Sequence, residues 1–404
     1  MVKKKPLRLL VVGATWPPQT FLGRLMRGLA ESGVVVSLAF NQKPDQDWFF
    51  RSGLRSFLTR SWTGPRALRL LWLAWLAVRA LAKSPRDTAR YLRRSLAEKR
   101  LGDKLAILNR LLPFAGISFD VLYFPWNSAA IDYFPLFGNG MPVVVSCRGS
   151  QINVAPHDPK RHIKEQLPAT FDSAAAVHCI SAAIEQEAQH FGLNPAKARV
   201  IHPGIEPGFF SPPPSRTPSS RLHVVSVGSL VWVKGTTDAL QALRLLLDRG
   251  VDAHLTLIGD GPERQRVLYT IDDLQLWDSV ELAGRLTPIT VRERLRESDV
   301  FLLPSLSEGF CNAAVEAMAC GVAVVMTNCG GVREGVTDGV EGFIVPRRDP
   351  EAMAEAVERL AKDPALRARM GQAGRERVLR QFTLSRHVGE FVRLLEEVRD
   401  CRVA

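Results

Sequence analysis

The chain has 404 residues, of which 46% are hydrophobic, and a formal net charge of +12. This length suits two domains, and the hydrophobic content supports an ordinary core in each. The six cysteines form no CxxC pair and have no histidine at metal-ligand spacing, which argues against a zinc-type site. The same cysteine pattern indicates reduced, mostly buried thiols in a cytosolic protein.

Apolar runs of four to eight residues alternate with amphipathic stretches, which favours α/β layers with parallel sheets. The first run contains Arg8 and leads into prolines without a small-residue cleavage site, so it predicts a buried strand rather than a signal peptide. In the first half of the chain we expect strands at 7–13, 34–40, 120–124, 142–147, 175–179 and 199–202. Helices are expected there at 21–32, 66–82, 86–111 and 182–191.

The second half shows the same alternation. Strands are expected at 222–227, 253–258, 279–282, 299–303, 322–326 and 342–345. Helices are expected at 235–249, 263–272, 289–296, 313–319, 350–361, 364–380 and 385–399. Between the halves, the proline- and serine-rich residues 205–220 predict a linker, because such a composition forms no core. We therefore expect a first domain at 1–204, a second at 221–384 and a C-terminal helix at 385–404, with no transmembrane segment.

The positive charge is concentrated in residues 51–110, which hold fifteen lysines and arginines against three acidic residues. Within this window, nine apolar residues between Arg69 and Arg79 fall far short of the ~20 that span a bilayer. Tryptophan beside arginine is typical of a helix in a membrane interface, so we expect peripheral contact with an anionic membrane at its inner face. Alternatively, the apolar side chains face the domain core and the arginines line an acceptor cleft. Nucleic acid is not an expected partner, because no nucleic-acid motif accompanies the patch.

Two glutamates, Glu308 and Glu316, lie eight residues apart in a loop that leads into a predicted short helix. The surrounding strands place Glu308 on the loop and Glu316 about one turn inside the helix. Free amides at a helix N-terminus favour a phosphate, whereas carboxylates suit the hydroxyl groups of a sugar or ribose. The spacing alone also fits two solvated glutamates. A helix N-terminus for a phosphate together with carboxylates for hydroxyl groups, however, indicates a nucleotide-sugar pocket.

Residues 305–336 resemble the donor-site signature of a large glycosyltransferase family, the retaining family 4 with the GT-B fold. The matching elements are Glu-Gly-Phe at 308–310, Glu-Ala-Met-Ala-Cys-Gly at 316–321, and Gly-Gly followed by glutamate at 330–334. The resemblance implies an α/β fold of two Rossmann-like domains facing a cleft, with the C-terminal helix returning to the N-terminal domain. The first domain would bind the acceptor and the second the nucleotide-sugar donor.

The resemblance also assigns roles within the loop. Glu308 would contact the transferred sugar, and Glu316 would accept hydrogen bonds from the ribose. The phosphates would meet the backbone of Gly309, Phe310, Cys311 and Asn312. No cofactor and no metal is expected, since a cation and the helix N-terminus stabilise the departing diphosphate and no Asp-x-Asp pair is placed to hold a metal.

Residues 225–235 read as a strand, a glycine-bearing loop and a helix start. This arrangement brings backbone amides and an ammonium to a phosphate at the carboxyl edge of a sheet. The family pattern there is Gly-Arg-Leu followed by Lys-Gly. In this chain Gly228 is followed by Ser229, which leaves Lys234 as the main cation for the diphosphate.

Two further loops complete the expected donor site. Gly259 and Gly261 belong to a turn in which the backbone can approach closely, and Asp260 between them is expected to cap it. Arg285 follows a glycine in a loop that resembles the one facing the nucleobase. The identity of the base stays open.

The N-terminal domain departs more from the family pattern. Thr20, in the first loop between strand and helix, is expected to touch donor phosphate or acceptor, and Gln19 stands where a subset of relatives has glutamate. Arg148 ends a strand where relatives often carry His-Gly. Its permanent cation can bind a diphosphate or an anionic acceptor but cannot act as a base. Alternatively, Arg148 pairs with an acidic residue across the cleft.

The resulting prediction is a retaining glycosyltransferase that moves a sugar from a UDP- or GDP-sugar to a lipid-linked or envelope glycan. Glu308, Lys234 and Arg148 are its expected catalytic residues. A nucleotide-sugar epimerase and an idle nucleotide-sugar-binding module remain alternatives. A dinucleotide oxidoreductase is disfavoured, because no GxGxxG follows the first strand.

Overall fold

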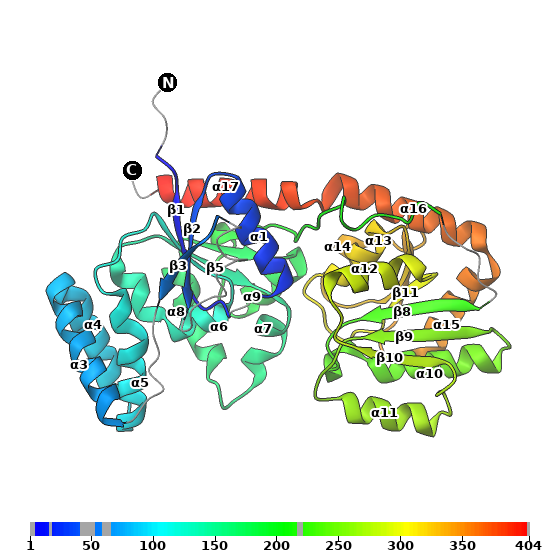
Figure 1. The fold of residues 1–404 in the computed structure, drawn as a ribbon, viewed down its shortest axis with the longest axis horizontal. Helices are drawn as coiled ribbons and strands as arrows, with labels where there is room; N and C mark the ends of the chain where they lie inside the picture. Colours follow the sequence, from blue (N-terminus) through cyan, green and yellow to red (C-terminus); the bar gives the residue numbers. More distant parts are fainter. Residues whose placement is uncertain (1–4, 16–17, 41–52, 59–65, 216–220, 402–404) are drawn as a thin grey trace. The chain divides into compact units, whose positions relative to one another are not determined.

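Two parallel β-sheets organise the chain, one in each of two units (Figure 1). The computed structural model describes residues 5–15, 18–40, 53–58, 66–215 and 221–401. Unit 1 contains residues 1–180, 185–201 and 388–404, and unit 2 contains residues 181–184 and 202–387. The sequence predicts one division near residue 204, whereas the structure also assigns four residues of the first half to unit 2.

The sheet of unit 1 has the strand order β3-β2-β1-β4-β5-β6-β7. Its strands are β1 (Arg8–Val11), β2 (Val35–Phe40), β3 (Arg55–Leu58), β4 (Val121–Phe124), β5 (Val143–Cys147), β6 (Ala176–Cys179) and β7 (Ala198–Val200). The central strands β1, β4 and β5 are buried almost throughout, as expected where helices cover both faces of a parallel sheet. Six of these seven strands are predicted from the sequence. The exception is β3, an edge strand whose sequence Arg-Ser-Phe-Leu has no sustained apolar run.

The helices of unit 1 are α1 (Thr20–Glu31), α3 (Arg66–Lys83), α4 (Pro85–Leu96), α5 (Leu101–Leu111), α6 (Asn127–Asp132), α7 (Gly149–Asn153), α8 (Ile163–Ser173) and α9 (Ala182–His190), of which the first three residues of α9 belong to unit 2. Helices α3, α4 and α5 lie side by side (Figure 1). The prediction of one helix over 86–111 is wrong. The helix stops after Leu96, and the Ser95 hydroxyl donates a hydrogen bond to the Lys104 carbonyl at 3.0 Å, which ties α5 to α4.

The sheet of unit 2 has the strand order β10-β9-β8-β11-β12-β13. Its strands are β8 (Leu222–Val227), β9 (Ala253–Ile258), β10 (Val280–Gly284), β11 (Val300–Leu303), β12 (Ala323–Thr327) and β13 (Gly342–Val345). Its helices are α10 (Thr236–Asp248), α11 (Arg264–Asp273), α12 (Pro288–Glu297), α13 (Asn312–Ala319), α14 (Val332–Gly335), α15 (Pro350–Lys362) and α16 (Pro364–Gln381). Leu243 of α10, Val357 of α15 and Val325 of β12 share one apolar core. The predicted strands and helices of this half are confirmed, and only the short α14 was not predicted.

The last helix, α17 (Leu384–Asp400), packs against unit 1 from Val388 onward. The ring of Phe391 lies 5.2 Å from that of Tyr123 and 5.0 Å from that of His178. A methyl group of Val388 fills the space beside Gly28, where an added Cβ would lie only 2.4 Å away. The expected return of the C-terminal helix to the N-terminal domain is confirmed.

The segment predicted as a linker, 205–220, is packed in its described part. Arg375 donates hydrogen bonds to the carbonyls of Phe210 and Pro207, at 2.7 and 2.9 Å, and Arg296 donates one to the Ser211 carbonyl. Phe210 is buried. Two arginines that bind backbone carbonyls thus hold this proline-rich segment on unit 2. The composition of the segment alone does not predict this packing.

Candidate functional site

The candidate site begins where the sheet of unit 2 changes direction. Strands β8 and β11 are hydrogen-bonded neighbours, although the chain passes through β9 and β10 before it reaches β11. Open α/β sheets bind their ligands in the crevice outside the carboxyl ends of two such strands. The loop after β8 contains Lys234, and the loop after β11 contains Glu308, so the topology brings these two distant segments to one edge.

A buried ion pair joins the two loops. Nζ of Lys234 donates a hydrogen bond of 2.6 Å to Oε1 of Glu308, and the hydroxyl of Ser305 donates one of 2.7 Å to the same oxygen. Glu308 is only 8% exposed. Burial by itself lowers the pKa of Lys234, but the charge and hydrogen bond of Glu308, together with the nearby Cys311 and Cys329, outweigh burial and leave that pKa above its ordinary value. Two of the three residues predicted as catalytic therefore lie in direct contact.

Backbone contacts fix the geometry of the pair. The Leu306 amide donates a hydrogen bond to the Val233 carbonyl at 2.7 Å, which links the neighbours of Glu308 and Lys234. Gly235 has a φ of 61°, and a Cβ at this position would lie 2.1 Å from the Pro304 carbonyl oxygen. Only glycine permits this approach, so the Lys-Gly sequence sets the distance between the two loops.

The Gly-Gly pair of the signature supports the Glu308 loop from the other side. Gly330 has a φ of 49°, and a Cβ there would lie 1.8 Å from the Glu308 carbonyl oxygen. At Gly331, a Cβ would lie 2.5 Å from the Gly309 carbonyl oxygen, and that oxygen accepts a hydrogen bond of 2.7 Å from the Ser181 hydroxyl. These glycines therefore act by allowing close packing of the loop that carries Glu308.

Glu334, which closes the signature, binds backbone amides of a neighbouring segment, a role that was not predicted from the sequence. Its carboxylate accepts hydrogen bonds from the amides of Ala182 and Ala183, at 2.7 and 3.0 Å, and lies 2.9 Å from Nε2 of His202. Burial raises its pKa, but these hydrogen bonds outweigh burial, so the pKa of Glu334 is below its ordinary value. The only sign of this role in the sequence was the position of the glutamate at a fixed distance after the Gly-Gly pair.

The glycine turn after β9 packs against the loop after β8. A Cβ on Gly259 would lie 1.9 Å from the Gly228 carbonyl oxygen, and one on Gly261 would lie 2.3 Å from the Leu230 carbonyl oxygen. Asp260 accepts a hydrogen bond of 2.9 Å from the Gly261 amide, so its predicted capping of the turn is confirmed. The close approach in this structure is thus between two loops of the protein.

The residues at the start of α13 make most of their contacts within the protein. The buried ring of Phe310 lies 5.1 Å from that of His202, so it serves packing. Sγ of Cys311 accepts a hydrogen bond from the Ala314 amide at 3.3 Å, and burial raises the pKa of this thiol. The Asn312 amide donates to the Phe310 carbonyl at 3.1 Å. Two amides of this helix start are therefore already bonded within the protein.

The other predicted donor-site residues lie on separate segments of unit 2. Glu316 is half-buried on α13, Ser229 is exposed directly after Gly228, and Arg285 is exposed directly after β10. The guanidinium of Arg285 is therefore accessible to a ligand, whereas the short side chain of Ser229 adds no charge beside Lys234.

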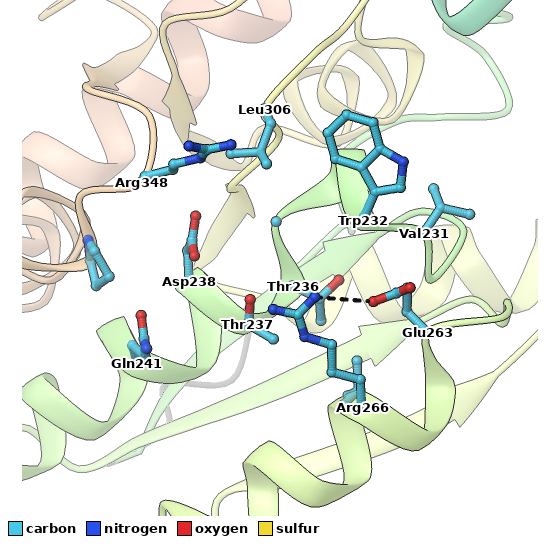
Figure 2. A pocket seen from close by; sticks show the side chains of 13 residues that line it. Val231, Trp232, Thr236, Thr237, Asp238, Gln241, Glu263, Arg266, Leu306 and Arg348 are labelled. Atoms are coloured by element: carbon cyan, nitrogen blue, oxygen red, sulfur yellow. Dashed lines mark hydrogen bonds and ion pairs between the residues drawn. The ribbon is translucent and has the colours of Figure 1, made fainter. Parts of the chain in front are cut away.

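A cavity of about 440 Å³ opens beside the ion pair, at the start of α10 (Figure 2). Gly235, Thr236 and Leu306 line it, and these residues belong to the two loops of the site. Figure 2 shows Arg266 directed toward Thr236 and the carboxylate of Asp238 directed toward the side on which Arg348 lies. Burial raises the pKa of Asp238. This cavity was not predicted from the sequence, because its lining comes from helix starts and loops that share no motif.

In unit 1, Arg148 and the start of α1 lie close together. The Arg148 guanidinium carbon lies 4.9 Å from the centre of the Phe21 ring, next to Thr20, which is exposed. Arg148 is buried and donates a hydrogen bond of 3.3 Å to the Tyr123 hydroxyl. Within the described part of unit 1 it forms no ion pair with a carboxylate. A buried, unneutralised guanidinium at the end of β5 is suited to an anionic ligand.

Two negative findings apply to the described residues. They contain no group of three or more histidine, cysteine, aspartate or glutamate residues that could hold a metal ion. Among the same residues, no helix has the length and apolar character needed to cross a membrane.

Comparisons with known proteins agree with this architecture. The family model "Glycosyltransferase Family 4" matches residues 19–209, and "Glycosyl transferases group 1" matches residues 210–377. The putative colanic acid biosynthesis glycosyltransferase WcaL of Escherichia coli is 36% identical over 173 residues, 41% of this chain and 43% of that relative. The match thus spans less than half the length of that curated relative.

Solved structures share the fold over nearly the whole chain. Anabaena HepE in complex with UDP and glucose has a TM-score of 0.73 at 16% identity, covering 96% of this chain and 99% of that one. Sucrose-phosphate synthase from Thermosynechococcus elongatus has a TM-score of 0.74 at 18% identity, covering 98% and 100%. The expected fold class, two Rossmann-like domains of the GT-B type, is confirmed. The two family models, which together match residues 19–377, show that the chain belongs to the group 1, family 4 glycosyltransferases.

Proposed function

We propose that the chain is a retaining glycosyltransferase that moves a sugar from a UDP- or GDP-sugar to a lipid-linked or envelope polysaccharide glycan. The reaction would take place at the cytoplasmic face of the cell membrane. The observation that carries this proposal is the ion pair of Lys234 and Glu308 at the switch point of the unit 2 sheet. The UDP and glucose complex of the Anabaena neighbour and the name of the Escherichia coli relative support the choice of substrates.

The chemistry of the pair fits the charges that develop during transfer. As the nucleoside diphosphate departs, negative charge grows on the leaving group and positive character grows on the anomeric carbon. The ammonium of Lys234 would stabilise the diphosphate, and the carboxylate of Glu308 would orient sugar hydroxyls and favour the cationic centre. In the structure these two groups neutralise each other at 2.6 Å. Donor binding would therefore draw Lys234 onto the diphosphate and free Oε1 of Glu308 for the sugar.

The remaining assignments follow the same division. Glu316 would accept hydrogen bonds from the ribose, and Arg285 would lie beside the base. Arg148 would supply a second cation for the diphosphate or for an anionic acceptor, and Thr20 would lie next to it. No resident metal is part of the proposal, since Lys234 and the start of α13 supply the positive charge; unchanged turnover after EDTA treatment is the expected result.

Calorimetry and turnover with a panel of UDP- and GDP-sugars test the proposal. Lys234→Ala removes a charged hydrogen-bond donor, worth about 1.5–3 kcal/mol, so the donor Kd should rise at least about tenfold. Glu308→Ala should abolish transfer. Glu355→Ala, an exposed change on α15, is the matched control and should behave as wild type.

Each outcome of the panel has a defined meaning. Transfer that survives loss of Glu308 would refute the site assignment, and an unchanged donor Kd in Lys234→Ala would refute the role of the ammonium. Donor binding without turnover on any acceptor would favour an idle binding module. Epimerised nucleotide sugar as the product would instead favour an epimerase.

A further inference from the structure

Helix α3 in unit 1 exposes an apolar stripe that the fold does not use. Leu68, Leu71, Trp75 and Val78 recur at helical spacing and are 47%, 67%, 49% and 70% exposed. Side chains at this spacing share one face of the helix, so these four form a continuous surface, here called the α3 stripe. An exposed, contiguous apolar surface marks an interaction site more often than scattered apolar residues do.

The opposite side of α3 already supplies what the core requires. Leu73, Leu76 and Ala80 are buried at 9%, 3% and 2% exposure, again at helical spacing. A surface helix normally needs one apolar face for the core and a polar face for water. Because α3 is apolar on both sides, packing within unit 1 explains the buried face but leaves the α3 stripe without a role.

A cavity of about 410 Å³ lies along the side of the same helix between its buried face and the α3 stripe, and Leu76 of the buried face also lines it. Phe57, Trp72, Leu76 and Pro113 give it aromatic and aliphatic walls, and Arg79 and Lys83 add two cations one helical turn apart. Within the described residues, neither cation forms an ion pair with a carboxylate. A cavity with apolar walls and two unneutralised cations suits a ligand that is both apolar and anionic.

Three stacked side chains join this cavity to the α3 stripe. The guanidinium carbon of Arg79 lies 5.3 Å from the centre of the Trp75 ring, and the Trp75 ring lies 4.9 Å from that of Trp72 at an interplanar angle of 24°. Trp75 belongs to the stripe, and Trp72 lines the cavity. A ligand that approaches over the stripe therefore reaches the cavity along a continuous aromatic and cationic surface.

We propose that the α3 stripe lies in the interface of an anionic bilayer and that the cavity binds the phosphate group of an anionic phospholipid. The argument for lipid is charge complementarity, since the window 51–110 holds fifteen basic and three acidic residues and accounts for the whole net charge of the chain. A second copy of the chain would bring two such windows together, and their like charges would repel. This proposal rests on the proposed function, because membrane binding would bring the glycosyltransferase to a membrane-bound acceptor.

Co-sedimentation with phosphatidylcholine vesicles, with and without one quarter phosphatidylglycerol, tests the membrane contact. Binding is expected only to the anionic vesicles. Each basic residue near an anionic surface contributes about fivefold to partitioning, so Arg79→Gln/Lys83→Gln should weaken binding by about 25-fold. The matched control, Lys160→Gln/Lys164→Gln, removes the same charge from an exposed part of unit 1 and should bind as wild type. Equal loss in both double variants would show that only net charge matters and would overturn the cavity.

The stripe and the headgroup require their own measurements. Leu71→Glu/Val78→Glu changes only exposed side chains and should abolish vesicle binding while the melting temperature stays at the wild-type value. Monomeric dihexanoylphosphatidylglycerol should compete for the cavity of the wild type, whereas dihexanoylphosphatidylcholine and inorganic phosphate should not. Vesicle binding that survives the stripe variant, or a wild-type dimer that this variant dissociates, would overturn the proposal. Donor turnover without vesicles should be unchanged in all these variants, which separates this test from that of the proposed function.

Discussion

Replacing Glu308 by glutamine should destabilise unit 2 by leaving the ammonium of Lys234 without its counter-charge. The carboxylate is 8% exposed, and it accepts hydrogen bonds from Lys234 at 2.6 Å and from Ser305 at 2.7 Å. Loss of one partner from a buried ion pair costs about 3–5 kcal/mol. The Lys234 side chain is 26% exposed, and water can solvate it in part, so we expect about 3 kcal/mol, at the low end of this range.

Differential scanning calorimetry gives the most direct assay of this change. For a unit of 150–250 residues, 1 kcal/mol corresponds to about 2–4 °C, so Glu308→Gln should lower the melting temperature by about 6–12 °C. The double variant Lys234→Met/Glu308→Gln removes both charges and should regain much of this loss. A Glu308→Gln protein that melts at the wild-type temperature would refute the reasoning, because it would show that the two groups are not paired in a buried setting.

The same pair has a defined pH dependence. The pKa of Lys234 is raised above its ordinary value of 10.5, so its contribution to stability is complete below pH 10.5 and is lost as pH rises through the folded-state pKa. The melting-temperature difference between wild type and Lys234→Met should stay constant up to about that pH and shrink above it.

Two further predictions concern the packing around the site, and a third concerns the docking of α17 on unit 1. Gly330→Ala should destabilise unit 2 far more than Gly339→Ala in urea unfolding, since both glycines have positive φ but only at Gly330 would a Cβ meet a backbone oxygen, at 1.8 Å; equal effects would contradict the clash. Glu334→Gln should lower stability at neutral pH, and this difference should shrink as the pH falls below 4.5, because a carboxyl pKa depressed below that ordinary value contributes fully above it and loses its contribution as the pH falls through the folded-state pKa; a constant difference would refute it. Phe391→Ala should cost about 3–5 kcal/mol and increase hydrogen exchange in α17, and unchanged exchange would contradict the docking of this helix on unit 1.

The regular part of the fold could be predicted because burial dictates it. In unit 2, central strands such as β11 and β12 are short apolar runs, and helices such as α15 have a clear apolar face, so pattern and structure coincide. Strand β3 was missed because an edge strand has one neighbour and needs little apolar character. The break between α4 and α5 comes with a side-chain bond from Ser95 to the Lys104 carbonyl, a tertiary contact that helical periodicity does not encode.

The candidate site shows a similar division. The sequence indicated Lys234 and Glu308 because each stands in a motif at the end of a strand. It did not indicate that they pair, since they are 74 residues apart and the contact depends on which strands become neighbours. Gly259 and Gly261 were interpreted as places where a ligand approaches, whereas in the structure the approaching group is the protein backbone itself. The cavity beside α10 and the amides bound by Glu334 arise from tertiary packing. Of these features, only the glutamate of the signature could be recognised in the sequence.

Proton NMR of the first product formed from an active UDP- or GDP-sugar tests the central claim most directly. Wild-type protein should release the nucleoside diphosphate and give a glycoside with the same anomeric configuration as the donor, and Lys234→Ala and Glu308→Ala should greatly slow or abolish its formation. A product of inverted configuration would contradict the retaining mechanism. Undiminished product from both variants would contradict the assignment of the reaction to the ion pair at the β8–β11 switch point.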